Sequence, residues 1–202
     1  MTFYQELFAE LQTKSHNELT FTKLKRNLAL KHHLKVIPSN VDVLLHAPIE
    51  EIPLLKKKLL TKPVRTISGV SPVAIMTAHS SCPHGKCTFC PGGLNSPWGD
   101  VPQSYTGHEP ATMRGMRNQY SSYLQVMNRL EQYILLGHTV DKIEIIVMGG
   151  TFPATTSEYQ EEFITSIFQA MNDFSELFFD RKGEIDFIKF KDFFQLPGGI
   201  HD

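Results

Sequence analysis

Residues 73–93 read VAIMTAHSSCPHGKCTFCPGG, and this stretch decides the fold and the chemistry that we expect of the chain. It opens on a short apolar run, Val73 to Met76, which is typical of a buried parallel strand. All three cysteines of the chain follow within nine residues: Cys82, Cys87 and Cys90. The Gly/Pro-rich segment 91–110 continues the loop and is too long to lack a role in a compact domain. The stretch therefore predicts a strand that carries a functional loop at its carboxyl end.

The segments after this loop repeat the same order of elements. A helix is expected over 111–136, with Gly137 as its C-terminal stop. A second apolar strand is expected over 142–148, followed by a further helix, capped by Thr156 or Ser157, through about residue 172. Two successive strand–loop–helix units are the start of a parallel α/β sheet or barrel, so the expected fold class is α/β.

The segment before the first strand is expected to be helical and basic. A helix is predicted over 22–33, and Ser39 or Asn40 offers the cap for a later one. Residues 1–65 hold 11 Lys and Arg against 6 Asp and Glu, whereas residues 66–202 hold 9 against 15. A basic segment joined to an acidic one favours a polyanionic partner, and nucleic acid is the obvious candidate. A solvated, lysine-rich helical surface is the alternative explanation.

The composition is that of a globular protein. Of the 202 residues, 41% are hydrophobic and 20% are charged, which argues against wholesale disorder. The apolar runs are far shorter than a membrane span, and the first residues lack the pattern of a signal peptide. We therefore expect a cytoplasmic protein without a membrane partner.

The cysteine spacing, C-x4-C-x2-C, indicates a metal or catalytic site, because an odd and tightly clustered set cannot form a disulfide framework. Three thiolates on a short loop can hold three corners of a cubane [4Fe–4S] cluster, and nearby glycines let the backbone bend around it. Ferredoxins with this opening need a fourth cysteine, which the chain lacks. The fourth iron would then be free to bind a substrate, as in a catalytic cluster.

Other interpretations of the cysteines stay open. Zinc could be held by the three thiolates together with His79 or His84, although zinc ligands usually come from two separated knuckles. A single nucleophilic cysteine needs only one thiol and a base, and inert buried cysteines do not suit a Gly/Pro-rich loop.

Two further features support a ligand site beside the loop. Phe89 precedes the third cysteine and could pack against the adenine of a nucleotide, or pack in the core. Gly149, Gly150 and Thr151 follow the second strand, at the edge where parallel sheets bind ligands.

Several motifs then point to one family: Val64–Val70, Cys82–Gly85, Cys90–Gly93, Gln103–Gly107 and Val140–Phe152. They resemble the catalytic subunit of Elongator, a tRNA wobble-uridine-modifying enzyme that joins a radical S-adenosylmethionine (SAM) domain to an acetyltransferase-like domain. The short cysteine loop is similar to the archaeal or bacterial form, and the resemblance covers about residues 22–172.

The resemblance implies a partial radical-SAM (βα) barrel preceded by a small helical basic region. It implies that SAM binds the unique iron and is cleaved to a 5′-deoxyadenosyl radical, which takes hydrogen from the acetyl group of acetyl-CoA. The resulting carbon radical would add to carbon 5 of the wobble uridine and give carboxymethyluridine. The implied cofactors are a [4Fe–4S] cluster and SAM, with acetyl-CoA as co-substrate.

Residue by residue, the family's cluster ligands correspond to Cys82, Cys87 and Cys90. Its SAM-binding motif corresponds to Gly149, Gly150 and Thr151, with Phe89 as a further candidate. Lys142 corresponds to a lysine assigned to acetyl-CoA, although by itself it would be a surface lysine at a strand edge. The tRNA-binding part of the family corresponds to the basic N-terminal region, including Lys23, Lys25, Arg26 and Lys31.

The expected organisation is a helical tRNA-binding region over 1–63, the first part of a radical-SAM domain over 64–172, and an insertion or truncated segment over 173–202. We expect the acetyltransferase domain to be absent and this chain to be inactive alone. The expected partners are tRNA, an unidentified electron donor and a second copy in a homodimer. From another class, the alternative is a zinc-stabilised nucleic-acid-binding module without catalysis.

Overall fold

The computed structural model describes residues 1–13 and 17–197, and its centre is a pair of parallel strands. Strand β1 spans Ser71–Met76 and strand β2 spans Ile143–Met148. They pair in parallel, from Ser71 opposite Ile143 to Met76 opposite Met148. Both strands were expected, and the α/β class is confirmed by this parallel pair among helices.

Two helices connect the strands, where one long helix had been expected over 111–136. Helix α5 spans Pro110–Arg117, and helix α6 spans Ser122–Leu135. The break occurs because Gln119 and Tyr120 adopt positive φ, and their amides bond back to Met116 and Gly115. This Schellman-type pattern ends α5, and the Ser121 hydroxyl then caps α6 by accepting from the amide of Leu124.

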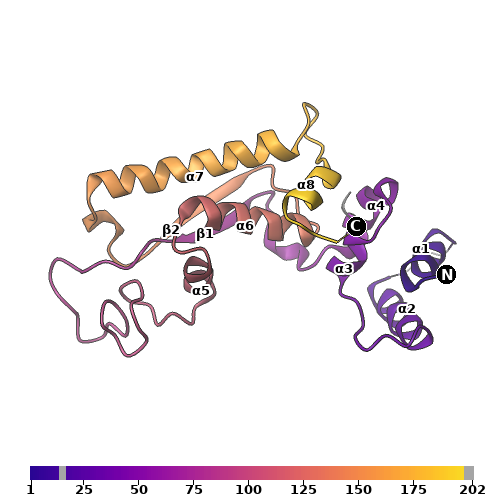
Figure 1. The fold of residues 1–202 in the computed structure, drawn as a ribbon, viewed down its shortest axis with the longest axis horizontal. Helices are drawn as coiled ribbons and strands as arrows, with labels where there is room; N and C mark the ends of the chain where they lie inside the picture. Colours follow the sequence, from indigo (N-terminus) through magenta and orange to yellow (C-terminus); the bar gives the residue numbers. More distant parts are fainter. Residues whose placement is uncertain (14–16, 198–202) are drawn as a thin grey trace.

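Helix α7, Ser157–Phe178, is longer than expected and packs along α6 (Figure 1). Its cap is Thr156, one of the two predicted residues, and the stop of α6 at Gly137 is confirmed by a φ of 85° there. The helix continues past residue 172 because Phe174 and Phe178 extend its buried stripe into the core.

The segment before β1 is helical, as predicted. The elements are α1 Phe3–Thr13, α2 Glu18–Lys31, α3 Asn40–Leu45, η1 Ile49–Glu51, α4 Ile52–Leu59 and η2 Pro63–Thr66. Helix α2 starts earlier than expected because the Asn17 side chain caps it by accepting from the Thr20 amide at 2.9 Å. Ser39 caps α3 and forms a reciprocal capping box with Asp42.

The last described segment packs back onto these N-terminal helices. Helix α8, Phe187–Phe193, follows a tight turn after α7 and contacts it. The buried ammonium of Lys191 donates to the carbonyl of Leu45, and the ammonium of Lys56 lies 5.2 Å from the ring centroid of Phe187. In the view of Figure 1, α8 lies beside the right-hand end of α6, between the sheet and the N-terminal helices.

None of the helices in the described part of the chain is long and apolar enough to cross a membrane.

Candidate functional site

The cysteine loop starts from a tightly held point at the carboxyl end of β1. Buried Gln125 of α6 accepts from the amide of Met76 at 2.9 Å and donates to its carbonyl, also at 2.9 Å. The amide of Thr77 then donates to the carbonyl of Met148 at 2.8 Å, which adds one more rung between the strands. The amide of Ala78 donates to the Tyr159 hydroxyl at 2.9 Å. The first residues of the loop are therefore anchored by α6, β2 and α7.

One cavity of about 200 Å³ brings the three cysteines together. Its lining residues are Cys82, His84, Cys87, Phe89, Cys90, Gln103, Ser104 and Gly150. Five of the residues predicted from the sequence are in this set, three as cluster ligands and two as SAM contacts. They come from the loop and from the end of β2, so the cavity lies at the carboxyl edge of the parallel pair, where parallel sheets bind ligands.

The sulfur atoms have polar neighbours. The His84 imidazole lies between two of them, with Nδ1 3.3 Å from Cys82 Sγ and Nε2 3.0 Å from Cys87 Sγ. The amide of Ser104, a residue with a φ of 70°, donates to Cys90 Sγ at 3.1 Å. Hydrogen bonds to sulfur are among the levers that set the reduction potential of an iron–sulfur cluster.

Glycine is required where loop and strand ends approach each other. A Cβ at Gly92 would lie 1.7 Å from the carbonyl oxygen of Tyr105, and a Cβ at Gly150 would lie 2.7 Å from that of Gln103. Gly149 has a φ of 143°, and a Cβ there would lie 2.0 Å from the Thr77 hydroxyl oxygen. Neither glycine of the pair that ends β2 can carry a side chain without moving its neighbour.

Two of the SAM candidates, Thr151 and Phe89, differ in exposure. Thr151 is buried, and its hydroxyl is 2.9 Å from that of Ser80, which ties the glycine motif to the cysteine loop. Phe89 is 95% exposed, which excludes the core-packing alternative for this ring. An exposed aromatic ring at the rim of a cavity is available to stack on a ligand.

The far end of the loop is held by the carboxylate of Glu109. It accepts from the amides of Thr106 and Gly107 and from the hydroxyls of Thr106 and Thr112, at 2.9 to 3.1 Å. Burial raises the pKa of this carboxyl, but the hydrogen bonds outweigh burial and lower the pKa to about 2. Glu109 therefore stays ionised and ties the loop to the start of α5.

The residues present fit a cluster held by three thiolates. All three thiols line one cavity, an amide already donates to one sulfur, and Gly92 allows the backbone to approach closely. Within residues 1–13 and 17–197, no three His, Cys, Asp or Glu side chains converge as ligands of one metal ion. A [4Fe–4S] cluster binds each thiolate through a different iron, so its ligands do not need to converge on one point.

The predicted tRNA-binding residues lie on α2, at the opposite end of the molecule from the long loop between β1 and α5 (Figure 1). Lys23 and Arg26 are exposed, and exposed Lys31 pairs with Glu6. Lys25, predicted from the sequence as a tRNA contact, is instead buried. It is only 7% exposed, and its ammonium donates to the Pro38 carbonyl at 3.1 Å and to Asn40 Oδ1 at 2.7 Å.

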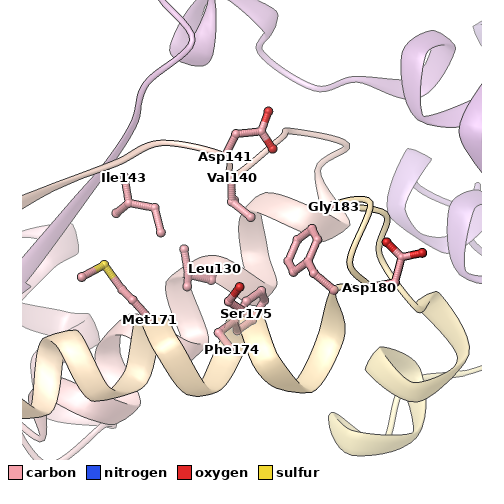
Figure 2. A pocket seen from close by; sticks show the side chains of 10 residues that line it. Leu130, Val140, Asp141, Ile143, Met171, Phe174, Ser175, Asp180 and Gly183 are labelled. Carbon is pink, nitrogen blue, oxygen red and sulfur yellow. The ribbon is translucent and has the colours of Figure 1, made fainter.

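Lys142 is not brought to the cysteine cavity. It precedes β2, whereas the cavity lies past the other end of that strand, about 20 Å away at 3.3 Å per residue. Its neighbours Asp141 and Ile143 line a second cavity of about 310 Å³ between α6, α7 and the turn after α7. Figure 2 shows apolar side chains facing one another there, with the carboxylates of Asp141 and Asp180 at the rim.

Sequence reasoning missed the residues that complete the cysteine cavity from the far side of the loop. Gln103 and Ser104 were noticed only as part of a family motif, without a role. The one signal for them is the length of the Gly/Pro-rich segment, which implies that it folds back on something. Gln125 gave no signal, because a glutamine within an amphipathic helix is ordinary until its partner is known.

The geometry thus defines an α/β protein with a three-thiol site at the carboxyl edge of a parallel strand pair. Residues 1–67 match the family described as the ELP3 N-terminal domain. This match, together with the relatives named Elongator complex protein 3, agrees with the resemblance to the Elongator catalytic subunit that the sequence motifs indicated.

The relatives agree with this family. The chain is 58% identical over 136 residues to a "tRNA uridine(34) acetyltransferase" of Methanocaldococcus infernus, covering 67% of this chain and 26% of the relative. It is 57% identical over 135 residues to the protein of the same name from Methanocaldococcus jannaschii, covering 67% and 25%. It is 41% identical over 160 residues to human "Elongator complex protein 3", covering 77% and 29%. The chain therefore spans about a quarter of the length of these relatives.

Proposed function

We propose that this chain is the cluster- and SAM-binding part of a tRNA uridine(34)-modifying acyltransferase that carboxymethylates carbon 5 of the wobble uridine with acetyl-CoA as co-substrate. The family match and the relatives' names support the coarse assignment to tRNA uridine modification. The finer chemistry rests on one observation, which is the shared cavity of the three cysteines and Gly150 at the end of β2.

Cys82, Cys87 and Cys90 are the proposed ligands of a [4Fe–4S] cluster. When bound, the cluster supplies the electron for reductive cleavage of SAM. The chain's own residues position and shield that reaction. The amide of Ser104 stabilises the thiolate of Cys90, and the exposed ring of Phe89 is free to stack on the adenine.

The end of β2 is the proposed binding site for the polar end of SAM. Gly149, Gly150 and Thr151 follow the strand, and the two glycines leave backbone groups uncovered by side chains of their own. The hydroxyl of Thr151 contacts Ser80 of the cysteine loop, so a ligand held by this motif lies against that loop. We assign β1 and β2 as the first two strands of a radical-SAM (βα) barrel on the same grounds.

The N-terminal domain is the proposed tRNA-binding region, with Lys23, Arg26 and Lys31 as phosphate contacts. Lys25 is left out of this set because its ammonium is buried and bonded. Lys142 remains a proposed contact for acetyl-CoA, at the end of β2 away from the cysteines. Binding through exposed lysines and arginines should weaken steeply with salt.

The experiment is anaerobic reconstitution of the full-length protein with iron and sulfide, comparing wild type with Cys87→Ser. Wild type should bind about four irons per chain, the stoichiometry of a [4Fe–4S] site, and should cleave SAM under reducing conditions. Cys87→Ser should lose the cluster and SAM cleavage while tRNA affinity stays within about twofold, since the proposed phosphate contacts are elsewhere.

Thr88→Ser is the matched control, because Thr88 is the exposed neighbour of Cys87 in the same loop. It should bind iron as wild type does. Retention of zinc without iron would instead support the zinc-stabilised binding module. Equal loss of cluster and tRNA binding in Cys87→Ser would contradict the division of roles proposed here.

A further inference from the structure

A second cationic surface lies around Tyr133 on α6. The Tyr133 side chain is fully buried, and its hydroxyl donates to the carbonyl of Pro72 on β1 at 2.7 Å. The guanidinium of Arg129 lies over the Tyr133 ring, 4.3 Å from its centroid, and the His138 ring is nearly perpendicular to the Tyr133 ring, with centroids 5.4 Å apart. Arg129 therefore packs against a buried aromatic ring that is itself fixed to β1.

A second guanidinium is fixed on the same strand. Arg114 of α5 donates from Nη1 to the carbonyl of Ala74 at 2.9 Å. Ala74 and Pro72 are two residues apart on β1, or about 6.6 Å along an extended strand. The anchors of Arg114 and Arg129 are thus neighbours in space. Nε of Arg114 is buried and has no hydrogen-bond partner among the described residues.

Two exposed arginines complete the group. Arg117 follows Arg114 by one helical turn on α5, and Arg65 belongs to η2, just before β1. The residue after Arg65 connects to the same network, because the hydroxyl of Thr66 lies 2.8 Å from Nδ1 of His138. We define the arginine patch by four residues: Arg65, Arg114, Arg117 and Arg129.

The charges of the arginine patch are not neutralised within the described part of the chain. No carboxylate there pairs with any of the four guanidinium groups. Burial lowers the pKa of Arg114, and the positive charges of Arg129, Arg117 and Arg65 lower it further. Like charges held together without counter-ions are costly, and a bound anion relieves that cost. Guanidinium groups in fixed orientations suit phosphate, which they bind through paired N–H donors.

The position of the patch suits a long polyanion. Figure 1 shows α5 and α6 between the long loop that carries the cysteines and the helices α1 and α2. An RNA that contacts both the cysteine loop and the exposed lysines of α2 therefore has to span the region of α5 and α6. A small anion would not need cations at both ends and in the middle.

We propose that the arginine patch binds backbone phosphates of the RNA substrate between the N-terminal domain and the cysteine cavity. This proposal rests on the proposed function, because it takes the RNA to be the tRNA whose uridine reaches that cavity. Arg65 and Arg117 contact phosphates directly, and Arg129, held on Tyr133, presents a fixed guanidinium beside them.

The test compares the double variant Arg65→Gln/Arg117→Gln with wild type in the full-length protein. Both side chains are exposed, so their replacement should leave the fold intact. Affinity is measured for a tRNA transcript with uridine at the wobble position over a series of salt concentrations. Loss of two phosphate contacts should reduce the slope of log K against log salt by about 1.5 and weaken binding about tenfold or more near ~0.1 M salt.

The charge-matched control is Arg181→Gln/Lys182→Gln, which removes two exposed cations from the turn between α7 and α8. It should leave the slope unchanged. An unchanged slope in Arg65→Gln/Arg117→Gln, or an equal fall in both double variants, would overturn the patch while leaving the proposed function intact. Failure of the wild-type protein to bind the transcript would overturn both the arginine patch and the proposed function. This outcome is seen in the wild-type titration and does not depend on the variants.

Discussion

Lys23 and Lys25 lie two residues apart on α2 but are held in different surroundings. Lys23 is exposed, whereas the ammonium of Lys25 is buried and donates to the Pro38 carbonyl and Asn40 Oδ1. Burial lowers the pKa of Lys25, and the charge of Asp42 partly opposes this. The ammonium of Lys25 therefore fixes the segment between α2 and α3. On this part of α2 the exposed side chains of Lys23 and Arg26 remain available to contact a phosphate.

Glu109 carries a pH dependence that can be measured. Its pKa is about 2 in the folded protein against an ordinary 4.5, so it stabilises the fold above pH 4.5 and that contribution is lost as the pH falls toward 2. Glu109→Gln keeps the shape and removes the charge. At pH 7 we expect a loss of about 1 kcal/mol in the free energy of unfolding, a modest value because the carboxylate is partly exposed to solvent.

Urea unfolding at several pH values checks this prediction. The difference between wild type and Glu109→Gln should shrink between pH 4.5 and pH 2, because wild type becomes protonated there. Glu158→Gln, at an exposed position in the first turn of α7, is the control, and its difference from wild type should stay smaller at pH 7. A constant difference for Glu109→Gln at all pH values would contradict the assignment.

Among the elements, α6 connects the sheet to both functional surfaces. Gln125 in its first half holds the last residue of β1, from which the cysteine loop starts. Tyr133 in its last turn holds Pro72 near the beginning of the same strand and carries Arg129. The Ser122 hydroxyl donates to the carbonyl of Phe163 at 3.0 Å, which ties the start of α6 to α7. One helix therefore determines where the loop begins and where the arginine patch is presented.

Replacing Gln125 should be strongly destabilising. Gln125→Met keeps the volume but leaves the amide and carbonyl of Met76 without this partner in a buried position. We expect the free energy of unfolding to fall by about 3 kcal/mol, since each unsatisfied buried group costs about 1–3 kcal/mol. Urea unfolding at neutral pH is the measurement.

Gln132→Met is the control for this substitution. Gln132 is on the same helix but is only partly buried, and it bonds side chains of its own helix, Asn128 and Arg129. Its replacement should cost less than about 0.5 kcal/mol. Equal effects of the two substitutions would show that the bonds of Gln125 to β1 do not hold the strand end.

Across the whole molecule, the last described segment joins the two halves of the chain. Helix α8 follows α7 and packs on it, while Lys191 of α8 donates to the Leu45 carbonyl of α3. Phe174, Phe178 and Phe190 form a buried aromatic group at this junction, with ring centroids 4.8 to 6.3 Å apart. The N-terminal helices and the sheet therefore share one hydrophobic core.

Phe190→Ala should open this junction. The ring is fully buried, so its removal is expected to cost about 3–5 kcal/mol. Amide hydrogen exchange should show faster exchange in α3 and α8 than in β1, because the loss lies far from the sheet. Phe193→Ala, at a ring that is 53% exposed on the same helix, is the control and should cost much less. Similar exchange in both variants would contradict a shared core.

The sequence by itself determined the features that are local. The apolar runs predicted both strands, the spacing of the cysteines predicted a single loop site, and Ser39 and Thr156 were recognisable caps. Each of these depends on residues within one or two turns of the chain, so a short window of sequence contains the whole physical cause.

Tertiary structure decided the rest. The burial of Lys25 depends on Asn40, and the site of α8 depends on Leu45, more than a hundred residues earlier in the chain. Burial and pairing are properties of contacts between distant segments, and periodicity along one segment does not contain them.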